Sequence, residues 1–311
     1  MYGVTELSRR FLCVDIGGTS TKAGILQTDG NLVFVDSIPS LPHIEDYFQS
    51  LVRLIRSVRE RAEGQGLQTV SEMGVSLAGF LDDARTHLVY NPNLSWLENF
   101  PLRHRLSKVF PDLQLELEVD SNAAALAEYH LGSGRGARRF LCVTCGTGLG
   151  VGMVVDGQPL RFAYGCLGDI GHVIIKRDGP PCSCGGIGCA EAIISAPNLA
   201  RQYRELTGMD ESATLRTVIE RANAGDRQAM DVIRNAGEWL GVAVASMANI
   251  LFPDRIAIAG GLSSALDLLA EPTRRVFQES ASIIARSRTT LEIATLKSNA
   301  SLVGAAWPFW K

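Results

Sequence analysis

The chain has 311 residues, of which 46% are hydrophobic and 20% charged, with a formal net charge of −3. This balance is typical of a soluble globular protein with room for two domains, and it argues against a basic surface for nucleic acid or membrane. The most apolar stretch, Gly241 to Phe252, is shorter than the ~20 residues of a membrane span. Asp15 interrupts the apolar run near the N-terminus, which argues against a signal peptide, and seven cysteines argue against a disulfide framework. We therefore expect a cytoplasmic protein.

The first elements along the chain form a pattern that occurs twice. Residues 11–30 read as a strand, a Gly-Gly-Thr turn, a second strand and an Asp-Gly turn that leads into a third strand. Residues 140–157 repeat this order, with Gly-Thr-Gly at the first turn. A strand trio that recurs after about 130 residues predicts two related domains.

Helical segments separate the remaining strands. Apolar residues at helical spacing predict a helix over residues 47–61, and an alanine-rich helix is expected from Ser121, its predicted N-cap, to Leu131. Strands that alternate with helices in this way predict an α/β fold. The other expected elements are strands over residues 72–77, 115–119, 256–259 and 291–296, a long helix over 227–251, a helix between the last two strands and a short final helix.

Three of the seven cysteines lie within eight positions of a glycine-rich loop, at Cys182, Cys184 and Cys189. His172 lies ten residues upstream of the first. Glycines let the backbone fold around a small ion, and three thiolates with one imidazole form a closed tetrahedral set that suits a structural zinc ion. The alternatives are a chance cluster of cysteines and a catalytic zinc, which would need an open coordination position.

A glycine-rich turn follows the first strand of each repeat, at residues 15–19 in the first repeat and at residues 145–148 in the second. Such turns offer backbone N–H groups and a threonine hydroxyl to phosphate oxygens, and Asp15 could hold Mg²⁺. Either turn alone could be an ordinary turn, but the pair in matching positions indicates phosphate binding. Neither fits the Walker pattern or the dinucleotide fingerprint. Gly260-Gly261, after a late strand, could bring backbone close to a nucleotide or form a simple strand-to-helix turn.

Three acidic residues stand at positions where chemistry is plausible. Asp120 lies where a strand ends and a helix begins, so it could deprotonate a hydroxyl during phosphoryl transfer, or it could be an N-cap or a surface charge. Asp169 and Glu191 flank the predicted zinc loop. A loop fixed by zinc would hold both carboxylates rigidly enough to bind sugar hydroxyls, and the alternative is two solvated acids.

These residues together resemble the ROK family of repressors, open reading frames and sugar kinases. The most specific part is Gly168-Asp-Ile-Gly-His172, nine intervening residues, and then Cys-x-Cys-Gly-x-x-Gly-Cys-x-Glu; the likeness extends to Leu302-Val-Gly-Ala-Ala. The resemblance implies an α/β, actin-like (ribonuclease H-like) fold of two domains with the active site in the cleft. It implies a first domain over residues 1–119 plus about 298–311, a second over 120–297, and a homodimer or homotetramer.

The resemblance also implies roles for single residues in an ATP-dependent sugar kinase. Asp120 matches the catalytic base, and His172 would bind zinc with one ring nitrogen and a sugar hydroxyl with the other. The sugar-binding positions are Gly79, Asn93, Asp120, Asp169, His172 and Glu191, and the zinc ligands are His172, Cys182, Cys184 and Cys189. The positions for ATP and Mg²⁺ are Asp15, Gly17, Gly18, Thr19, Ser20, Lys22, Gly146, Thr147, Gly148, Gly260 and Gly261.

Two departures from the family pattern concern the substrate. Val119 stands where the family usually has Asn, and Asp169 stands where it usually has Glu. The resemblance implies a hexose or N-acetylhexosamine that is phosphorylated at O6. Sites that bond a hydroxyl discriminate strongly, so we expect these two changes to shift the preference away from glucose.

Two other functions stay open at this point. One is a sugar-responsive transcriptional regulator, which is disfavoured because only ten residues precede the first strand, too few for a helix-turn-helix. The other is a sugar-binding protein without turnover, which the changes at Val119 and Asp169 would favour.

Overall fold

A computed structural model describes residues 9–67 and 70–310. The chain divides into two compact units. Unit 1 consists of Met1–Ala127, Arg161–Cys166 and Asn299–Lys311, and unit 2 of Glu128–Leu160 and Leu167–Ser298. The short segment Arg161–Cys166 therefore belongs to unit 1, although the chain on either side of it belongs to unit 2.

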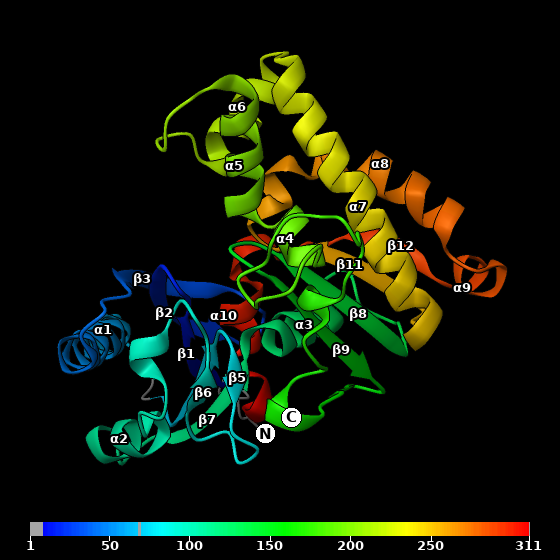
Figure 1. The fold of residues 1–311 in the computed structure, drawn as a ribbon. Helices are drawn as coiled ribbons and strands as arrows, with labels where there is room; N and C mark the ends of the chain where they lie inside the picture. The colour runs from blue at the N-terminus through cyan, green and yellow to red at the C-terminus, as the bar shows by residue number, and fades with distance from the viewer. Residues whose placement is uncertain (1–8, 68–69, 311) are drawn as a thin grey trace. The chain divides into compact units, whose positions relative to one another are not determined.

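Unit 1 contains a five-stranded sheet in the order β3-β2-β1-β4-β7 (Figure 1). The first three strands pair antiparallel, and β4 and β7 continue the sheet in parallel with β1. A small hairpin, β5 (Phe80–Leu81) with β6 (Leu88–Tyr90), follows β4. The strands are β1 (Arg10–Ile16), β2 (Ser20–Gln27), β3 (Leu32–Pro39), β4 (Glu72–Leu77) and β7 (Gln114–Val119). The helices are α1 (Ile44–Gly64), α2 (Leu102–Val109), α10 (Ala300–Gly304) and α3 (Asp120–Leu131), of which the part from Glu128 on belongs to unit 2.

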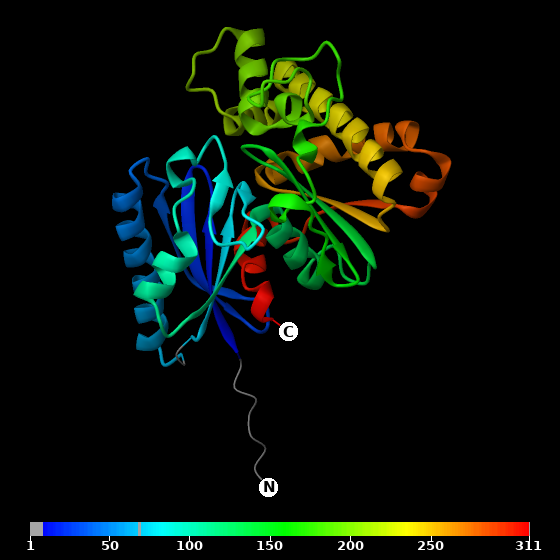
Figure 2. The same cartoon turned by 60° about the horizontal axis from the view of Figure 1, so that its bottom comes forward.

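Both faces of this sheet are covered at its centre, and the central strand β1 is accordingly a nearly continuous apolar run, Phe11 to Val14. Leu12 and Val14 of β1 pack in one core with the apolar face of α1. Phe11, on the opposite face of the same strand, stacks on Trp310 from the C-terminal segment, with ring centroids 5.9 Å apart. Figure 2 shows α1 and the C-terminal segment on opposite sides of the sheet.

Unit 2 contains a second five-stranded sheet, in the order β10-β9-β8-β11-β12. Its antiparallel trio and its two parallel strands reproduce the arrangement of unit 1, so the repeat predicted from the sequence and the α/β class are confirmed. The strands are β8 (Arg139–Cys145), β9 (Leu149–Val155), β10 (Gln158–Pro159), β11 (Arg255–Ala259) and β12 (Thr290–Ile293).

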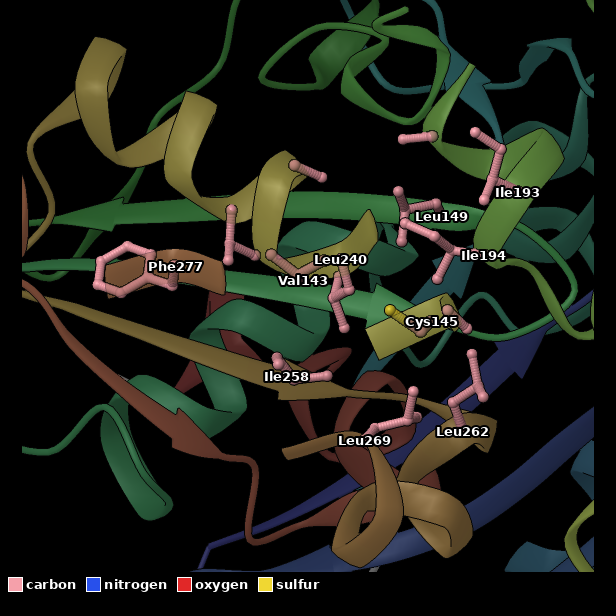
Figure 3. Packing of buried hydrophobic residues seen from close by; sticks show 14 of the residues in the cluster. Val143, Cys145, Leu149, Ile193, Ile194, Leu240, Ile258, Leu262, Leu269 and Phe277 are labelled. Carbon is pink, nitrogen blue, oxygen red and sulfur yellow. The ribbon is translucent and has the colours of Figure 1, made fainter. Parts of the chain in front are cut away.

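Long helices cover this second sheet. Leu240 of α7 and Phe277 of α8 are buried in one cluster with Val143 and Ile258 of the sheet (Figure 3). The helices are α4 (Ala190–Ile194), α5 (Ala196–Thr207), α6 (Leu215–Asn223), α7 (Arg227–Leu251), α8 (Leu266–Ser280) and α9 (Ile283–Arg288). Short 3₁₀ turns in the two units lie at Ser95–Leu97, Ala163–Gly165, Ile170–His172, Gly261–Ala265, Lys297–Asn299 and Trp307–Phe309.

Two local predictions need correction. Helix α3 begins at Asp120, so Ser121 lies inside the helix and is not its N-cap; the backbone N–H of Ser121 donates to the Asp120 carboxylate instead, at 2.7 Å. The last strand ends at Ile293 rather than at residue 296, because Thr295 and Leu296 donate their backbone N–H groups to the buried carboxylate of Glu128. The domain boundaries, which were expected near Asp120, stay a prediction. Within the described residues, no helix combines the length and apolar character needed to cross a membrane.

Close packing of α10 on α3 predicts a strong effect of one methyl group. A Cβ at Gly304 would lie 1.7 Å from the backbone oxygen of Ala123, which cannot move without displacing α3. We expect Gly304→Ala to lower the free energy of unfolding by at least the 1–3 kcal/mol typical of overpacking. Gly64→Ala is the matched control, because nothing lies within 4 Å of a Cβ there. Equal urea midpoints for the two variants would contradict this packing.

Candidate active site and metal centre

The predicted base, Asp120, lies at the junction of β7 and α3 in unit 1. Its side chain is surrounded by protein yet keeps some exposure to solvent. Burial raises the pKa of Asp120 to about 7, and the nearby negative charge of Asp15 acts in the same direction. A carboxyl group with a pKa near neutrality suits a general base.

Asp15 lies at the end of β1 and in register with polar neighbours on both sides. It pairs with Lys22 on β2 and with Ser76 on β4. Burial raises the pKa of Asp15, and the Ser76 hydroxyl and the Lys22 ammonium oppose that rise. Two acids beside one another in a confined space favour a cation, which is consistent with the predicted role of Asp15 toward Mg²⁺.

The first predicted phosphate loop contacts one of the predicted sugar-binding residues. The N–H of Gly17 donates to the backbone oxygen of Ser20 at 3.1 Å, which closes the turn, and Thr19 is exposed at its tip. A Cβ at Gly18 would lie 2.9 Å from the Cβ of Asn93, so the loop of Asn93 packs directly on this turn. Gly79 has a φ of +110° and would place a Cβ 2.6 Å from the backbone oxygen of Tyr90.

A buried acid that the sequence analysis did not identify supports this junction. Glu118, only 1% exposed, accepts hydrogen bonds from the N–H of Val119 at 3.1 Å and from the amide of Asn122 at 2.9 Å. The guanidinium groups of Arg85, at 3.1 Å, and of Arg161 also donate hydrogen bonds to this carboxylate. Glu118 thus fixes the residues on both sides of Asp120. The strand alternates polar and apolar residues, Gln-Leu-Glu-Leu-Glu-Val, so the sequence carried no signal that Glu118 is buried while Gln114 and Glu116 are not.

The two arginines also border a cavity of about 380 Å³ within unit 1. The backbone oxygen of Gly165 accepts a hydrogen bond from Asn122 at 2.7 Å, and the N–H of Tyr164 donates to Asp83 at 3.2 Å. These bonds attach the segment Arg161–Cys166 to the start of α3, at Asn122, and to the loop between β5 and β6, at Asp83. The cavity is lined by Asp83, Arg85, Arg161, Phe162, Ala163 and Gly165.

This network predicts unequal effects of two neighbouring substitutions. Glu118→Gln leaves two arginines without their buried partner, so we expect a loss of about 3 kcal/mol in the free energy of unfolding. Glu116→Gln removes a more exposed ion pair with Arg103 and a longer one, at 4.0 Å, with Arg85, and it should cost less than about 1 kcal/mol. Urea denaturation of both variants measures the difference, and equal costs would contradict the network.

In unit 2 the structure brings the four predicted zinc ligands together. Their ligand atoms all lie within 4.8 Å of one another. The Nδ1 of His172 is 3.3 Å from the sulfur of Cys182, and the sulfurs of Cys184 and Cys189 are 3.7 Å apart. Tetrahedral zinc, with Zn–S of about 2.3 Å and Zn–N of about 2.0 Å, separates its ligand atoms by about 3.5–3.8 Å. The residues present therefore fit a structural zinc ion.

The second ring nitrogen of His172 faces the two acids that flank the loop. Its Nε2 lies 3.7 Å from Asp169 and 3.9 Å from Glu191. The other carboxylate oxygen of Glu191 accepts the N–H of Leu149 at 3.0 Å, directly after the second predicted phosphate loop. The metal group, both acids and this loop are thus neighbours within unit 2.

The late glycine pair also lies at the second phosphate loop. Gly260 has a φ of +94°, and a Cβ there would lie 2.5 Å from the backbone oxygen of Cys145. A Cβ at Gly146 would lie 4.0 Å from the backbone nitrogen of Gly261. Thr147, between Gly146 and Gly148, is exposed. Unit 2 therefore groups five of the predicted nucleotide-binding residues, and unit 1 groups the other six.

Comparisons with known proteins identify the family of this chain. The ROK family profile matches residues 11–311. A glucokinase from Halalkalibacterium halodurans is 32% identical over 96% of this chain and 94% of its own length. An N-acetylmannosamine kinase from Escherichia coli O139:H28 is 30% identical over 95% and 96%.

A solved structure of a family member has the same fold as this chain. The crystal structure of a ROK family glucokinase from Streptomyces griseus, in complex with glucose and AMPPNP, matches with a TM-score of 0.85 and 29% identity. The match covers 96% of this chain and 98% of that one. The two-domain actin-like α/β fold implied by the resemblance is thereby confirmed. A profile match over nearly the whole length and relatives of 30% identity or more show that this chain belongs to the ROK family.

Proposed function

We propose that this protein is an ATP-dependent sugar kinase that phosphorylates O6 of a hexose or an N-acetylhexosamine. The observation that carries the proposal is Asp120 at the β7–α3 junction, with its pKa raised to about 7 beside Asp15. The relatives named glucokinase and N-acetylmannosamine kinase support the same reaction class.

The proton and the phosphoryl group move as follows in this proposal. The Asp120 carboxylate accepts the proton of the sugar hydroxyl while that oxygen bonds to the γ-phosphorus of ATP. The bond from the γ-phosphorus to the bridging oxygen breaks, and ADP leaves. The glycine turns at Gly17–Gly18 and Gly146–Gly148 donate backbone N–H groups to phosphate oxygens, with Gly260 and Gly261 near the nucleotide. Asp15 and Lys22, with the hydroxyls of Thr19, Ser20 and Thr147, bind Mg²⁺ and phosphate.

The remaining site residues hold the sugar. The backbone at Gly79 and the amide of Asn93 contact the sugar. The Nε2 of His172 and the carboxylates of Asp169 and Glu191 bond its hydroxyls, and a structural zinc ion bound to the Nδ1 of His172 and the three cysteines keeps the imidazole ring in place. Zinc contributes order here and takes no part in the transfer.

The substrate preference follows from two side chains. Val119 is only 3% exposed, so it offers the sugar no polar contact. Asp169 is one methylene shorter than glutamate, and its carboxylate is exposed. Both features favour a sugar other than glucose, because a site that lacks a hydroxyl's partner loses discrimination for that hydroxyl.

The test is a coupled assay of ADP release with Mg²⁺ and ATP. The panel contains glucose, mannose, fructose, allose, N-acetylglucosamine and N-acetylmannosamine. We expect turnover well above background with at least one of them. No signal with any sugar, together with sugar binding by calorimetry, would favour the sugar-binding protein without turnover. A specific shift of upstream DNA in a gel would favour the regulator.

The assembly belongs to the same proposal. We propose a homodimer or homotetramer in the cytoplasm, without a nucleic-acid or membrane partner. Light scattering coupled to gel filtration tests this, and a mass of one chain would contradict it.

A further inference from the structure

The second phosphate loop, Gly146–Leu149, is held at both ends by one segment of unit 2. The N–H of Gly146 donates to the backbone oxygen of Gly148 at 2.9 Å and closes the turn. The backbone oxygen of Gly146 accepts the N–H of Ala196 at 2.8 Å. At the other end, the carboxylate of Glu191 accepts the N–H of Leu149 at 3.0 Å. Glu191 and Ala196 lie at the start of α4 and just after its end.

The contact of Glu191 with this loop leaves no room for a side chain. A Cβ at Gly148 would lie 2.6 Å from the Oε2 of Glu191. On the other side, a Cβ at Gly171 would lie 2.3 Å from the backbone oxygen of Leu149. Gly171 precedes the zinc ligand His172, and Glu191 follows the zinc ligand Cys189 by two positions. Two residues next to zinc ligands, Gly171 beside His172 and Glu191 near Cys189, therefore contact the phosphate loop.

We propose that Glu191 is a positioning residue for ATP as well as a sugar ligand: its Oε2 fixes the backbone of the Gly146–Leu149 loop through the N–H of Leu149, and its Oε1 is left for the sugar. The inference rests on the proposed function, because it assigns this loop to the phosphates of ATP. Nucleotide affinity then depends on Glu191 even when no sugar is present. A hydrogen bond to a charged group contributes about 1.5–3 kcal/mol, which corresponds to roughly tenfold or more in affinity.

The first experiment measures the affinity for Mg²⁺·AMPPNP by calorimetry without sugar, with the zinc content of each variant determined in parallel. We expect Glu191→Ala to weaken nucleotide binding about tenfold at full zinc occupancy. Glu191→Gln keeps an oxygen that can accept the N–H of Leu149, so it should restore most of the affinity. Glu205→Ala is the control: Glu205 lies on the exposed face of α5 in the same unit, paired with Arg201, and its replacement should leave the nucleotide affinity unchanged.

The second experiment approaches the same bond from the loop. Gly148→Ala would push the Glu191 carboxylate away from Leu149, so it should weaken nucleotide binding by a similar factor. In the Glu191→Ala background the clash is absent, and adding Gly148→Ala should cost less than about twofold more. If Glu191→Ala loses zinc, the single variant Gly148→Ala still tests the bond, because Gly148 is not one of the four zinc ligands and the zinc content of this variant is measured in parallel.

The outcomes separate the two proposals. Wild-type nucleotide affinity in Glu191→Ala, or fully additive effects in the double variant, would overturn the positioning role and leave the kinase proposal intact. A wild-type protein that binds no nucleotide would overturn both.

Discussion

Asp120→Asn is expected to reduce kcat on the best sugar by about 10²–10⁴-fold, the range that general-base catalysis contributes. Asparagine has nearly the same size but cannot accept the proton of the hydroxyl. In the wild type, kcat/KM should decrease as the pH is lowered through an apparent pKa near 7, because the protonated Asp120 is inactive. That apparent value belongs to the pair of Asp15 and Asp120, since the two charges interact. Rates measured from pH 5.5 to 8.5 test this.

The same substitution should stabilise the fold at alkaline pH. Burial raises the folded-state pKa of Asp120 above its unfolded value of about 3.9, so the folded chain binds the proton more tightly. The stability from this group is complete below pH ~4 and is lost as the pH rises toward about 7. An asparagine side chain at this position does not titrate, and so the Tm of Asp120→Asn relative to wild type should increase between pH 4.5 and 8.

Asp112→Asn provides the control for both measurements. Asp112 lies on the surface of unit 1, paired with Arg59, whose hydrogen bond lowers the pKa of Asp112. Its replacement should leave turnover unchanged and cost less than about 1 kcal/mol. Full turnover in Asp120→Asn, or a Tm difference that is constant with pH, would show that the role assigned to Asp120 is wrong.

Cys184→Ser is expected to lose bound zinc and sugar affinity together. Cys184 supplies one of four ligands, and structural zinc sites in small domains contribute roughly 10–16 kcal/mol of apparent binding free energy. Without the ion, the Nδ1 of His172 keeps the sulfur of Cys182, at 3.3 Å, as its partner in the described part of unit 2. Sulfur is a weak hydrogen-bonding atom, so the Nε2 would no longer face Asp169 and Glu191 in one fixed orientation. We expect the sugar Kd to rise at least about tenfold, which a loss of 1.4 kcal/mol would produce.

Metal analysis and sugar calorimetry on the same samples test this expectation. Cys142→Ala is the matched control, because Cys142 is a buried thiol of the same unit that lies outside the ligand group. It should retain zinc and sugar affinity. Loss of zinc from Cys184→Ser with unchanged sugar affinity would reduce the zinc to a support of the fold alone.

Much of the architecture could be predicted because it follows from local patterns. The duplicated strand trio showed itself through Gly-Thr and Asp-Gly turns, and the two sheets have matching strand orders. The Cys-x-Cys spacing and His172 predicted a group whose atoms do converge. Helix α1 is three residues longer at each end than its apolar spacing indicated, because its first and last turns are largely exposed and leave little hydrophobic signal.

The features that escaped prediction depend on contacts between distant segments. Glu118 looked like an ordinary strand residue, and its role required Arg85 and Arg161, which lie 33 and 43 positions away in the chain. Glu128 likewise accepts bonds from a segment more than 160 residues downstream, which is why the last strand ended early. The contact of Glu191 with Leu149 belongs to the same class, since its partner is a backbone N–H group that no sequence motif marks.

The most direct test of the proposed reaction is to identify its product. The protein is incubated with Mg²⁺, ATP and the sugar that gives the highest ADP release, and the product is examined by ³¹P and ¹³C nuclear magnetic resonance. The proposal predicts a sugar monophosphate esterified at O6, formed in amounts equal to ADP by the wild type and barely at all by Asp120→Asn. ADP without a phosphorylated sugar, or equal product from both proteins, would contradict it.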